Sequence, residues 1–257
     1  MLYVLLSPAK KLDFKPAPAW AKATMPALLK DTSVLAGVSK KLSVGDLKKL
    51  MGLSDALAKL NHARFQAFDP ANAGETKPAA FAFNGEVYLG LEAKTLTPED
   101  IAFAQTHLGI LSGLYGLLRP LDSIQPYRLE MGTDLKTPRG KSLHEFWREP
   151  LTAHLNGVLA KLKSPTLVNL ASEEYFGALD AAKLKAPVIQ PVFKEIKNGK
   201  AMMLSFFFKK ARGMMARWIV QNRIDAASDL KRFDVGGYRF EPTMSDDTTW
   251  VFTRKVK

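Results

Sequence analysis

The chain begins with a short apolar run, Leu2–Leu6, which Ser7 and Pro8 interrupt. A run of this length that ends at a turn signal is typical of a buried strand. The next stretch, residues 15–26, is rich in Pro, Ala and Lys and predicts irregular structure. Apolar runs further along predict four more strands, over residues 166–170, 188–196, 201–208 and 248–254, with Asn198-Gly199 as the turn between the second and third of them.

Residues 43–68 change to the spacing of two short helices. Ser43 is a natural N-cap, and Asp46 three residues later completes a capping box. Gly52 predicts the end of the first helix, and Ser54 predicts the start of the second. The second helix is expected to run to about Phe68 and to bury an apolar face formed by Leu57, Leu60 and Ala63.

Two further segments carry clear local signals. Residues 80–83 and 86–89 are β-prone runs on either side of Asn84-Gly85, a pattern typical of a β-hairpin. Thr97 followed by Pro98 and two acidic residues predicts the start of a helix, because it combines an N-cap, proline in the first position and negative charge in the first turn.

Strands and helices mix without regular alternation, which predicts one α+β domain over residues 1–257. No apolar run is long enough to span a membrane, and the opening residues lack the basic start of a signal peptide, so we expect a cytoplasmic protein without membrane contact. The absence of cysteine excludes thiol chemistry. The four histidines are scattered, so neither a metal site nor a cofactor is expected.

The formal net charge of +12 and the pI of about 9.7 favour a polyanionic partner. Residues 1–64 hold eleven Lys or Arg and four Asp or Glu, and residues 194–223 hold eight and one, so each segment carries a net +7. Residues 65–193 carry twelve and fourteen, a net of −2. Because the excess positive charge lies in two short segments, we expect patterned basic surfaces that could contact this polyanion.

The first basic segment contains a turn that resembles a helix-hairpin-helix element, a pair of short helices that binds DNA. Glycine in such a turn lets the backbone approach a phosphate, and the N–H groups that start the second helix point toward it. This turn has Met51 in place of the usual proline, and an ordinary helical hairpin with solvated lysines is the alternative. The candidate phosphate-binding residues are Lys48, Lys49, Gly52, Ser54 and Arg64.

The second basic segment predicts a helix over residues 209–223 with a cationic face. At roughly 100° per residue, its basic side chains fall within about 160°, opposite Met214 and Trp218. Such a face can follow a phosphate backbone without reading sequence. A solvated helix face and a membrane-surface helix are the alternatives. The candidate DNA-binding residues here are Lys209, Lys210, Arg212 and Arg217, with Arg223 on the same face.

The central run from Leu111 to Gly132 concentrates glycines, prolines and both signs of charge. It predicts a tightly turned loop around Arg119, Asp122, Tyr127, Arg128 and Glu130, and loops of this composition are often functional sites. A buried network of structural ion pairs is an equal alternative. The candidate cleft residues are Arg119, Asp122, Tyr127, Arg128, Glu130 and, further along the chain, Glu174.

Five runs together resemble the YaaA peroxide-stress family: residues 7–13, 83–88, 111–132, 169–175 and 209–213. The resemblance extends from end to end. It implies a cytosolic protein of oxidative-stress resistance, a single α+β domain of unusual topology, a positively charged cleft, and binding to duplex or distorted DNA. It implies no settled catalytic residue. Lys11 stands where the family often has threonine, and at a phosphate contact its added charge would strengthen binding.

These observations favour a sequence-nonspecific DNA-binding protein over an enzyme, with Lys10 and Lys11 as further phosphate contacts and no obligate protein partner. The alternative is an enzyme that acts on a small phosphorylated or nucleotide ligand in the same cleft. Its anion clamp would be Lys10, Arg119, Arg128 and Arg212, and its acid or base would be Asp122, Glu130 or Glu174. A third hypothesis is iron handling by carboxylates such as Asp122, Glu130, Glu173 and Glu174, together with the dispersed histidines.

Overall fold

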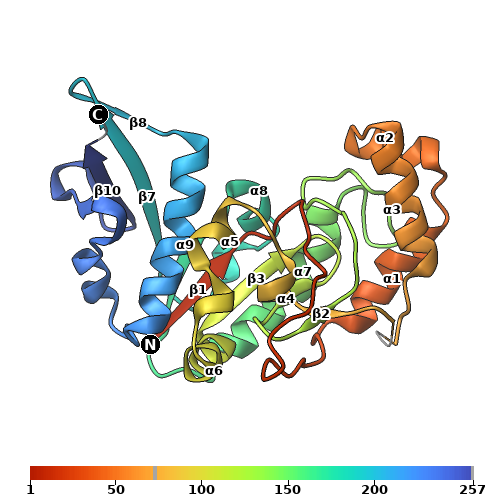
Figure 1. The fold of residues 1–257 in the computed structure, drawn as a ribbon, viewed down its shortest axis with the longest axis horizontal. Coiled ribbons are helices and arrows are strands. Elements are labelled where there is room, and N and C mark those ends of the chain that lie inside the picture. The colour runs from red at the N-terminus through yellow and green to blue at the C-terminus, as the bar shows by residue number, and fades with distance from the viewer. Residues whose placement is uncertain (72–73, 256–257) are drawn as a thin grey trace.

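The computed structural model describes residues 1–71 and 74–255, which form an α/β fold around one large mixed sheet (Figure 1). Within these residues the strand order is β4-β3-β1-β6-β7-β10-β9, and β8 pairs with β7. A small separate ribbon joins β2 (Lys77–Pro78) to β5 (Ser123–Ile124). The strands of the large sheet are β1 (Leu2–Leu6), β3 (Leu108–Ser112), β4 (Gly116–Leu118), β6 (Thr166–Leu170), β7 (Val188–Lys197), β8 (Lys200–Met202), β9 (Arg239–Phe240) and β10 (Thr249–Lys255).

The centre of the sheet is parallel. Strand β1 pairs in parallel with β3 on one side and with β6 on the other, and β7 and β10 continue this order. Strands β4, β8 and β9 are antiparallel additions. All five residues of β1 are buried, as expected for a strand that is covered on both faces. The predicted strands over residues 2–6, 166–170, 188–196 and 248–254 are confirmed, and so is the mixed α and β composition.

The path of the chain reverses direction across the sheet between β1 and β6. From β1 it moves to β3 on one side, and it then returns past β1 to add β6 on the other side. The carboxyl ends of β1 and β6 are therefore neighbours at a topological switch point, the place in such sheets where ligands usually bind.

Helices α6 and α9 pack against the central strands, whereas α1, α2 and α3 form a group at the other end of the molecule (Figure 1). The α-helices are α1 (Leu29–Lys40), α2 (Val44–Met51), α3 (Asp55–Ala67), α4 (Ala79–Ala82), α5 (Glu86–Leu91), α6 (Pro98–His107), α7 (Leu143–Leu159), α8 (Glu173–Phe176) and α9 (Ser205–Gln221). Short 3-10 helices cover Ala93–Thr95, Ala181–Lys183, Ala227–Arg232, Val235–Gly237 and Pro242–Met244.

The predicted pair of helices over residues 43–68 is confirmed as α2 and α3, and the predicted start of α6 is confirmed by its capping box. The apolar face predicted for α3 is wrong. Leu57 and Leu60 are 38% and 45% exposed, while Ala58, Asn61 and Phe65 are buried. The buried face of α3 is the one that packs on α1 and α2, and these contacts are not visible in the spacing of its leucines.

The hairpin predicted around Asn84-Gly85 is also wrong, because α4 and α5 occupy this segment. Gly85 has extended backbone, with φ of −153°, rather than the positive φ of a two-residue hairpin turn. Helix α5 packs against α9, which lies far away in the sequence. A Cβ on Gly90 would stand 2.1 Å from the Lys210 carbonyl oxygen, and one on Gly213 would stand 1.8 Å from the Val87 carbonyl oxygen. The backbones of α5 and α9 therefore touch through these two glycines.

The strand predicted over residues 201–208 is correct only at its start. The turn at Asn198-Gly199 is confirmed, with positive φ of 50° and 75°. Strand β8 ends at Met202, and helix α9 begins at Ser205. All three residues of β8 are exposed, so no apolar face holds a longer strand against the core.

The central run that predicted a tightly turned loop begins instead with the last residues of β3 and all of β4, which are joined at residues 113–115. Gly116 has a φ of 71°, and a Cβ at this position would stand 2.7 Å from the Trp147 ring. The Trp147 indole N–H donates to the Gly113 carbonyl oxygen at 2.9 Å. The glycines of this run therefore let the β3–β4 connection pack directly against Trp147 of α7.

Candidate functional site

A cavity of about 620 Å³ lies where β1 and β6 end, and we call it the edge cavity. Its walls come from residues 7–11 after β1, residues 84–88 around the start of α5, residues of 172–175 after β6, Glu130, and two basic residues of α9. Each of the five runs that carry the family resemblance contributes at least one lining residue. The edge cavity is thus assembled from segments that are distant in the sequence.

Polar contacts of Ser7 connect three of these segments. The Ser172 backbone N–H donates to Ser7 Oγ at 2.8 Å, and the Tyr88 hydroxyl donates to the Ser7 carbonyl oxygen at 3.0 Å. Gly85 lets residues 84–86 approach the loop after β1, because a Cβ there would stand 2.9 Å from the Ala9 Cβ. The end of β1 therefore holds α5 and the segment after β6 in place around the edge cavity.

Four cationic side chains line the edge cavity: Lys10, Lys11, Lys209 and Arg212. Lys10 Nζ lies 2.6 Å from Glu130 Oε2. Within residues 1–71 and 74–255, the other three form no hydrogen bond or ion pair through their side chains. The Arg212 guanidinium is half-buried over the Phe208 ring, at 5.1 Å from its centroid. Burial lowers the pKa of Arg212, and the charge of Glu173 partly opposes this change.

Three carboxylates line the same cavity, so it is mixed in charge rather than purely basic. Glu130 accepts from Arg128 at 3.0 Å as well as from Lys10. Glu174 Oε1 accepts from the Gly132 backbone N–H at 3.0 Å, and Glu86 is the third carboxylate. Burial raises the pKa values of the Tyr88 and Tyr175 hydroxyls well above the usual range, so these two lining groups stay neutral.

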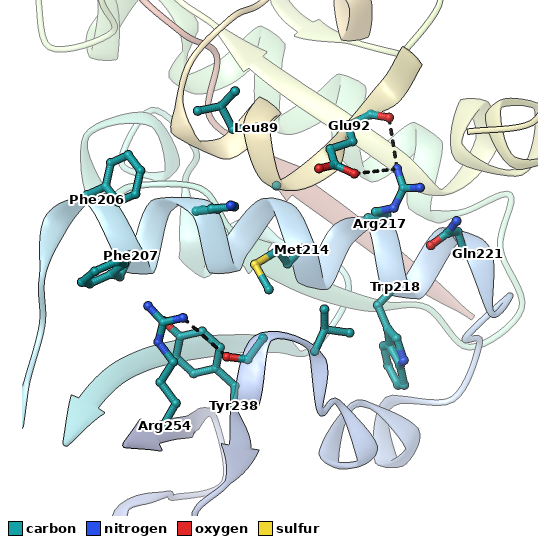
Figure 2. Close-up of a pocket in the computed structure, with 14 residues that line it drawn as sticks. Leu89, Glu92, Phe206, Phe207, Met214, Arg217, Trp218, Gln221, Tyr238 and Arg254 are labelled. Atoms are coloured by element: carbon teal, nitrogen blue, oxygen red, sulfur yellow. Dashed lines mark hydrogen bonds and ion pairs between the residues drawn. The ribbon is translucent and has the colours of Figure 1, made fainter. Parts of the chain in front are cut away.

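Helix α9 has a second hollow on another side, a groove of about 420 Å³ shown in Figure 2. Arg217 lines this groove and donates to the carbonyl oxygens of Leu91 and Glu92, both at 3.0 Å. Arg254 lies over the Phe207 ring, 4.6 Å from its centroid. Lys210 also lines this groove. The basic residues of α9 are thus divided between the edge cavity and the groove, and they do not form the single cationic face that the helical spacing predicted.

The charged side chains of the groove contact other residues of the protein. Arg254 also stacks on the Tyr238 ring, 4.7 Å from the centroid, and its Nε lies 3.3 Å from Glu195 Oε1. The Tyr238 hydroxyl donates to this same carboxylate, which is fully buried. Arg217 therefore connects α9 to the end of α5, and Arg254 connects β10 to the start of α9. Arg223, just after α9, forms an ion pair of 2.8 Å with Asp100 of α6.

The candidate residues of the predicted helix-hairpin-helix element lie on α2, on α3 and in the turn between them, away from α9 (Figure 1). Gly52 adopts a left-handed conformation with φ of 61°, and Ser54 Oγ accepts from the Leu57 backbone N–H. Lys48 Nζ pairs with Asp55 at 2.8 Å, and Lys49 is exposed. Arg64 donates to Asn61 Oδ1 at 3.3 Å. None of these described residues lines the edge cavity.

Arg119 and Asp122 lie elsewhere and form an ion pair in which the aspartate is buried and the Arg119 side chain is 44% exposed. The Asp122 carboxylate is 1% exposed and accepts from Arg119 Nη2 at 2.8 Å and from Thr24 Oγ1 at 2.7 Å. Tyr127 is buried, and its hydroxyl lies 2.6 Å from Ser112 Oγ. Of the candidate cleft residues, Glu130 and Glu174 line the edge cavity, and Arg128 reaches it only through Glu130.

Several lining residues were missed by sequence reasoning, namely Ser7, Asn84, Glu86, Ser172 and Tyr175. Ser7 and Ser172 each lie just after a strand of the parallel centre, and this position is a signal that could have identified them. Asn84 and Glu86 could not be placed because their segment was expected to be a hairpin.

In the part of the chain that the structure describes, no group of three or more His, Asp or Glu is arranged to hold a metal ion. No helix among these residues is long and apolar enough to cross a membrane.

The sheet with a parallel centre and the polar cavity at its switch point identify the chain as a mixed α/β protein. The chain belongs to the family described as peroxide stress protein YaaA. The model of this family matches residues 1–244, and this match confirms the resemblance seen in the sequence. The chain is 54% identical over 253 residues to a UPF0246 protein of Phenylobacterium zucineum, covering 98% of this chain and 95% of that protein. It is 53% identical to one of Caulobacter vibrioides over 98% and 99% of the two chains. It is 50% identical to one of Saccharophagus degradans over 99% and 100%.

Proposed function

We propose that this protein of the peroxide-stress family binds the phosphate backbone of DNA through the α2–α3 hairpin, without reading base sequence. The observation that carries the proposal is the left-handed turn at Gly52 between two capped helices, with basic side chains exposed beside it. A turn of this kind lets a phosphate approach the backbone and the start of α3 closely.

The charges of the hairpin favour a polyanion. Residues 43–67 hold four Lys or Arg and two Asp or Glu. Lys49 is exposed and forms no ion pair with another described residue, so it is available to a phosphate. Lys48 shares its charge with Asp55, which is itself exposed. Phosphate contacts of this type position a protein on DNA and carry no sequence information.

The edge cavity is the less suitable surface for a DNA strand. Its cations stand beside the carboxylates of Glu86, Glu130 and Glu174, which repel a continuous chain of phosphates. Our proposal therefore assigns DNA contact to the hairpin, and it separates Lys48 and Lys49 from Lys10 and Lys11.

A salt titration tests this assignment. We expect the affinity for a labelled duplex to fall steeply between about 50 and 200 mM salt. The double variant Lys48→Ala with Lys49→Ala is expected to reduce the slope of log K against log salt by about 2, close to one for each lysine removed from a phosphate. Fluorescence anisotropy of the duplex gives the dissociation constants.

The matched control is the double variant Lys10→Ala with Lys11→Ala, which removes the same charge from the edge cavity. It is expected to leave the slope close to that of the unmodified protein. An equal reduction of the slope in both double variants would show that the hairpin has no special role in DNA binding.

A further inference from the structure

We propose that the edge cavity binds a small phosphomonoester that carries hydroxyl groups, such as a sugar phosphate or a nucleoside monophosphate. The phosphate group would contact the cations of the cavity, and the hydroxyl groups would donate to its carboxylates. The proposal rests on residues other than those of the hairpin, so a failure of DNA binding would not contradict it.

The position of the cavity is the first argument. It lies at the carboxyl ends of β1 and β6, where the path of the chain reverses across the sheet. In open sheets with a parallel centre, this crevice is formed by loops that diverge to opposite faces, and ligands bind there. Its volume of about 620 Å³ also falls within the range of small-molecule sites.

The unpaired cations are the second argument. Lys11, Lys209 and Arg212 line the same cavity, and within the described residues none of them forms an ion pair or a side-chain hydrogen bond, although the charge of Glu173 acts on Arg212. A half-buried guanidinium without an acceptor loses part of its hydration and gains no hydrogen bond in return. A phosphate offers acceptor oxygens in the geometry that a guanidinium binds in pairs. Lys209 and Arg212 lie one helical turn apart on α9, so both can contact one such group.

The carboxylates are the third argument, and they define the rest of the ligand. Ionised carboxylates only accept hydrogen bonds, so Glu130 and Glu174 suit hydroxyl groups of a ligand. They also disfavour a second phosphate, because like charges repel strongly where water is partly excluded. One phosphate group and several hydroxyls therefore match the cavity better than an oligophosphate or a nucleic acid strand.

Calorimetric titration of the full chain with ribose 5-phosphate, AMP, inorganic phosphate and ribose tests the proposal. We expect saturable binding of ribose 5-phosphate or AMP with one ligand per chain, weaker binding of inorganic phosphate, and no binding of ribose. The preferred phosphomonoester shows whether a base is required. The variant Arg212→Met is expected to weaken binding roughly tenfold or more, since it removes hydrogen bonds to a charged group.

Two further variants distinguish the removal of a ligand-binding group from damage to the fold. The Lys10 side chain is 64% exposed, so Lys10→Ala is expected to keep the thermal unfolding temperature and still weaken binding several-fold. Lys49→Ala, which removes a lysine of the hairpin, is expected to leave ligand affinity unchanged.

Three results would overturn the proposal. The first is the absence of saturable binding of every phosphomonoester at concentrations up to about 5 mM, where even weak sites bind. The second is unchanged affinity in both Arg212→Met and Lys10→Ala. The third is equal affinity for inorganic phosphate and for ribose 5-phosphate, which would remove any role for Glu130 and Glu174.

Discussion

The α2–α3 hairpin and the edge cavity are both basic, but they differ in how their charges are held. The hairpin is built from 24 consecutive residues, Val44 to Ala67, and its lysines project into solvent. The edge cavity is assembled from five distant segments and places carboxylates among its cations. Exposed charge on a local element favours a long polyanion of any sequence, whereas enclosed charge of both signs favours one small ligand.

The largest expected effect concerns the contact that shapes the edge cavity. Gly213→Ala would place a Cβ 1.8 Å from the Val87 carbonyl oxygen, and backbone on both sides cannot give way cheaply. We expect a loss of about 3 kcal/mol or more in the free energy of unfolding. Urea denaturation gives this value.

Gly157→Ala is the matched control, because Gly157 is also within a helix but a Cβ there meets no atom within 4 Å. It is expected to stabilise the protein by about 0.5–1 kcal/mol. Similar destabilisation by both substitutions would contradict the close approach of α5 and α9.

The second prediction compares a buried and an exposed aspartate that each pair with a cation. Asp122→Ala leaves Arg119 and Thr24 without their common acceptor, and we expect a loss of about 1–3 kcal/mol because the Thr24 hydroxyl loses its buried partner. Asp55→Ala in the hairpin is expected to cost less than about 1 kcal/mol, since its pair with Lys48 is exposed to solvent. Both values come from urea denaturation, and equal losses would mean that burial does not distinguish the two pairs.

The third prediction tests the turn of the hairpin. Gly52→Ala forces an alanine into left-handed backbone with φ of 61°, which is expected to cost about 1 kcal/mol. The variant should bind DNA more weakly, because the turn is strained, and should bind ribose 5-phosphate as before. Gly45→Ala within α2, where the nearest atom is 3.7 Å away, serves as the control and is expected to retain DNA affinity.

The smallest effect is a pH dependence at the start of the hairpin. Hydrogen bonds from Ser43 lower the pKa of Asp46 below its usual value. Because the folded-state pKa is the lower one, the stabilisation is complete above the unfolded-state pKa of about 3.9 and is lost as the pH falls through the folded-state pKa. A titration of the Asp46 carboxylate by NMR gives the folded-state pKa, and Ser43→Ala should raise it. An unchanged pKa in that variant would contradict the capping box.

The two regions also differ in how well the sequence predicted them. The hairpin follows from local signals, because Ser43, Asp46, Gly52 and Ser54 act on neighbours within four residues, and each of their conformations is confirmed. The central strands were predicted for the same reason. The sequence also identified most of the charged residues of the edge cavity. The DNA-binding interpretation divided them between two sites, whereas the enzyme alternative placed Lys10, Arg212, Glu130 and Glu174 in one cleft.

The edge cavity itself could not be predicted, because the contacts that form it join residues far apart in the chain. The segment around Asn84-Gly85 has the local pattern of a hairpin, yet it leads into helix α5, which packs closely on Gly213 more than a hundred residues later. The exposed leucines of α3 show the same limit, since its buried face is chosen by α1 and α2. The spacing of apolar residues predicts individual helices and strands. Packing between helices and strands that are distant in the sequence determines which residues come together in a site.

The most direct test of two separate sites is a titration with ribose 5-phosphate in the absence and in the presence of saturating duplex DNA. If the hairpin binds DNA and the edge cavity binds the phosphomonoester, the dissociation constant of ribose 5-phosphate should be the same in both titrations. A dissociation constant that rises in proportion to the DNA concentration would show that the two ligands compete for one site, and it would contradict the division between hairpin and cavity.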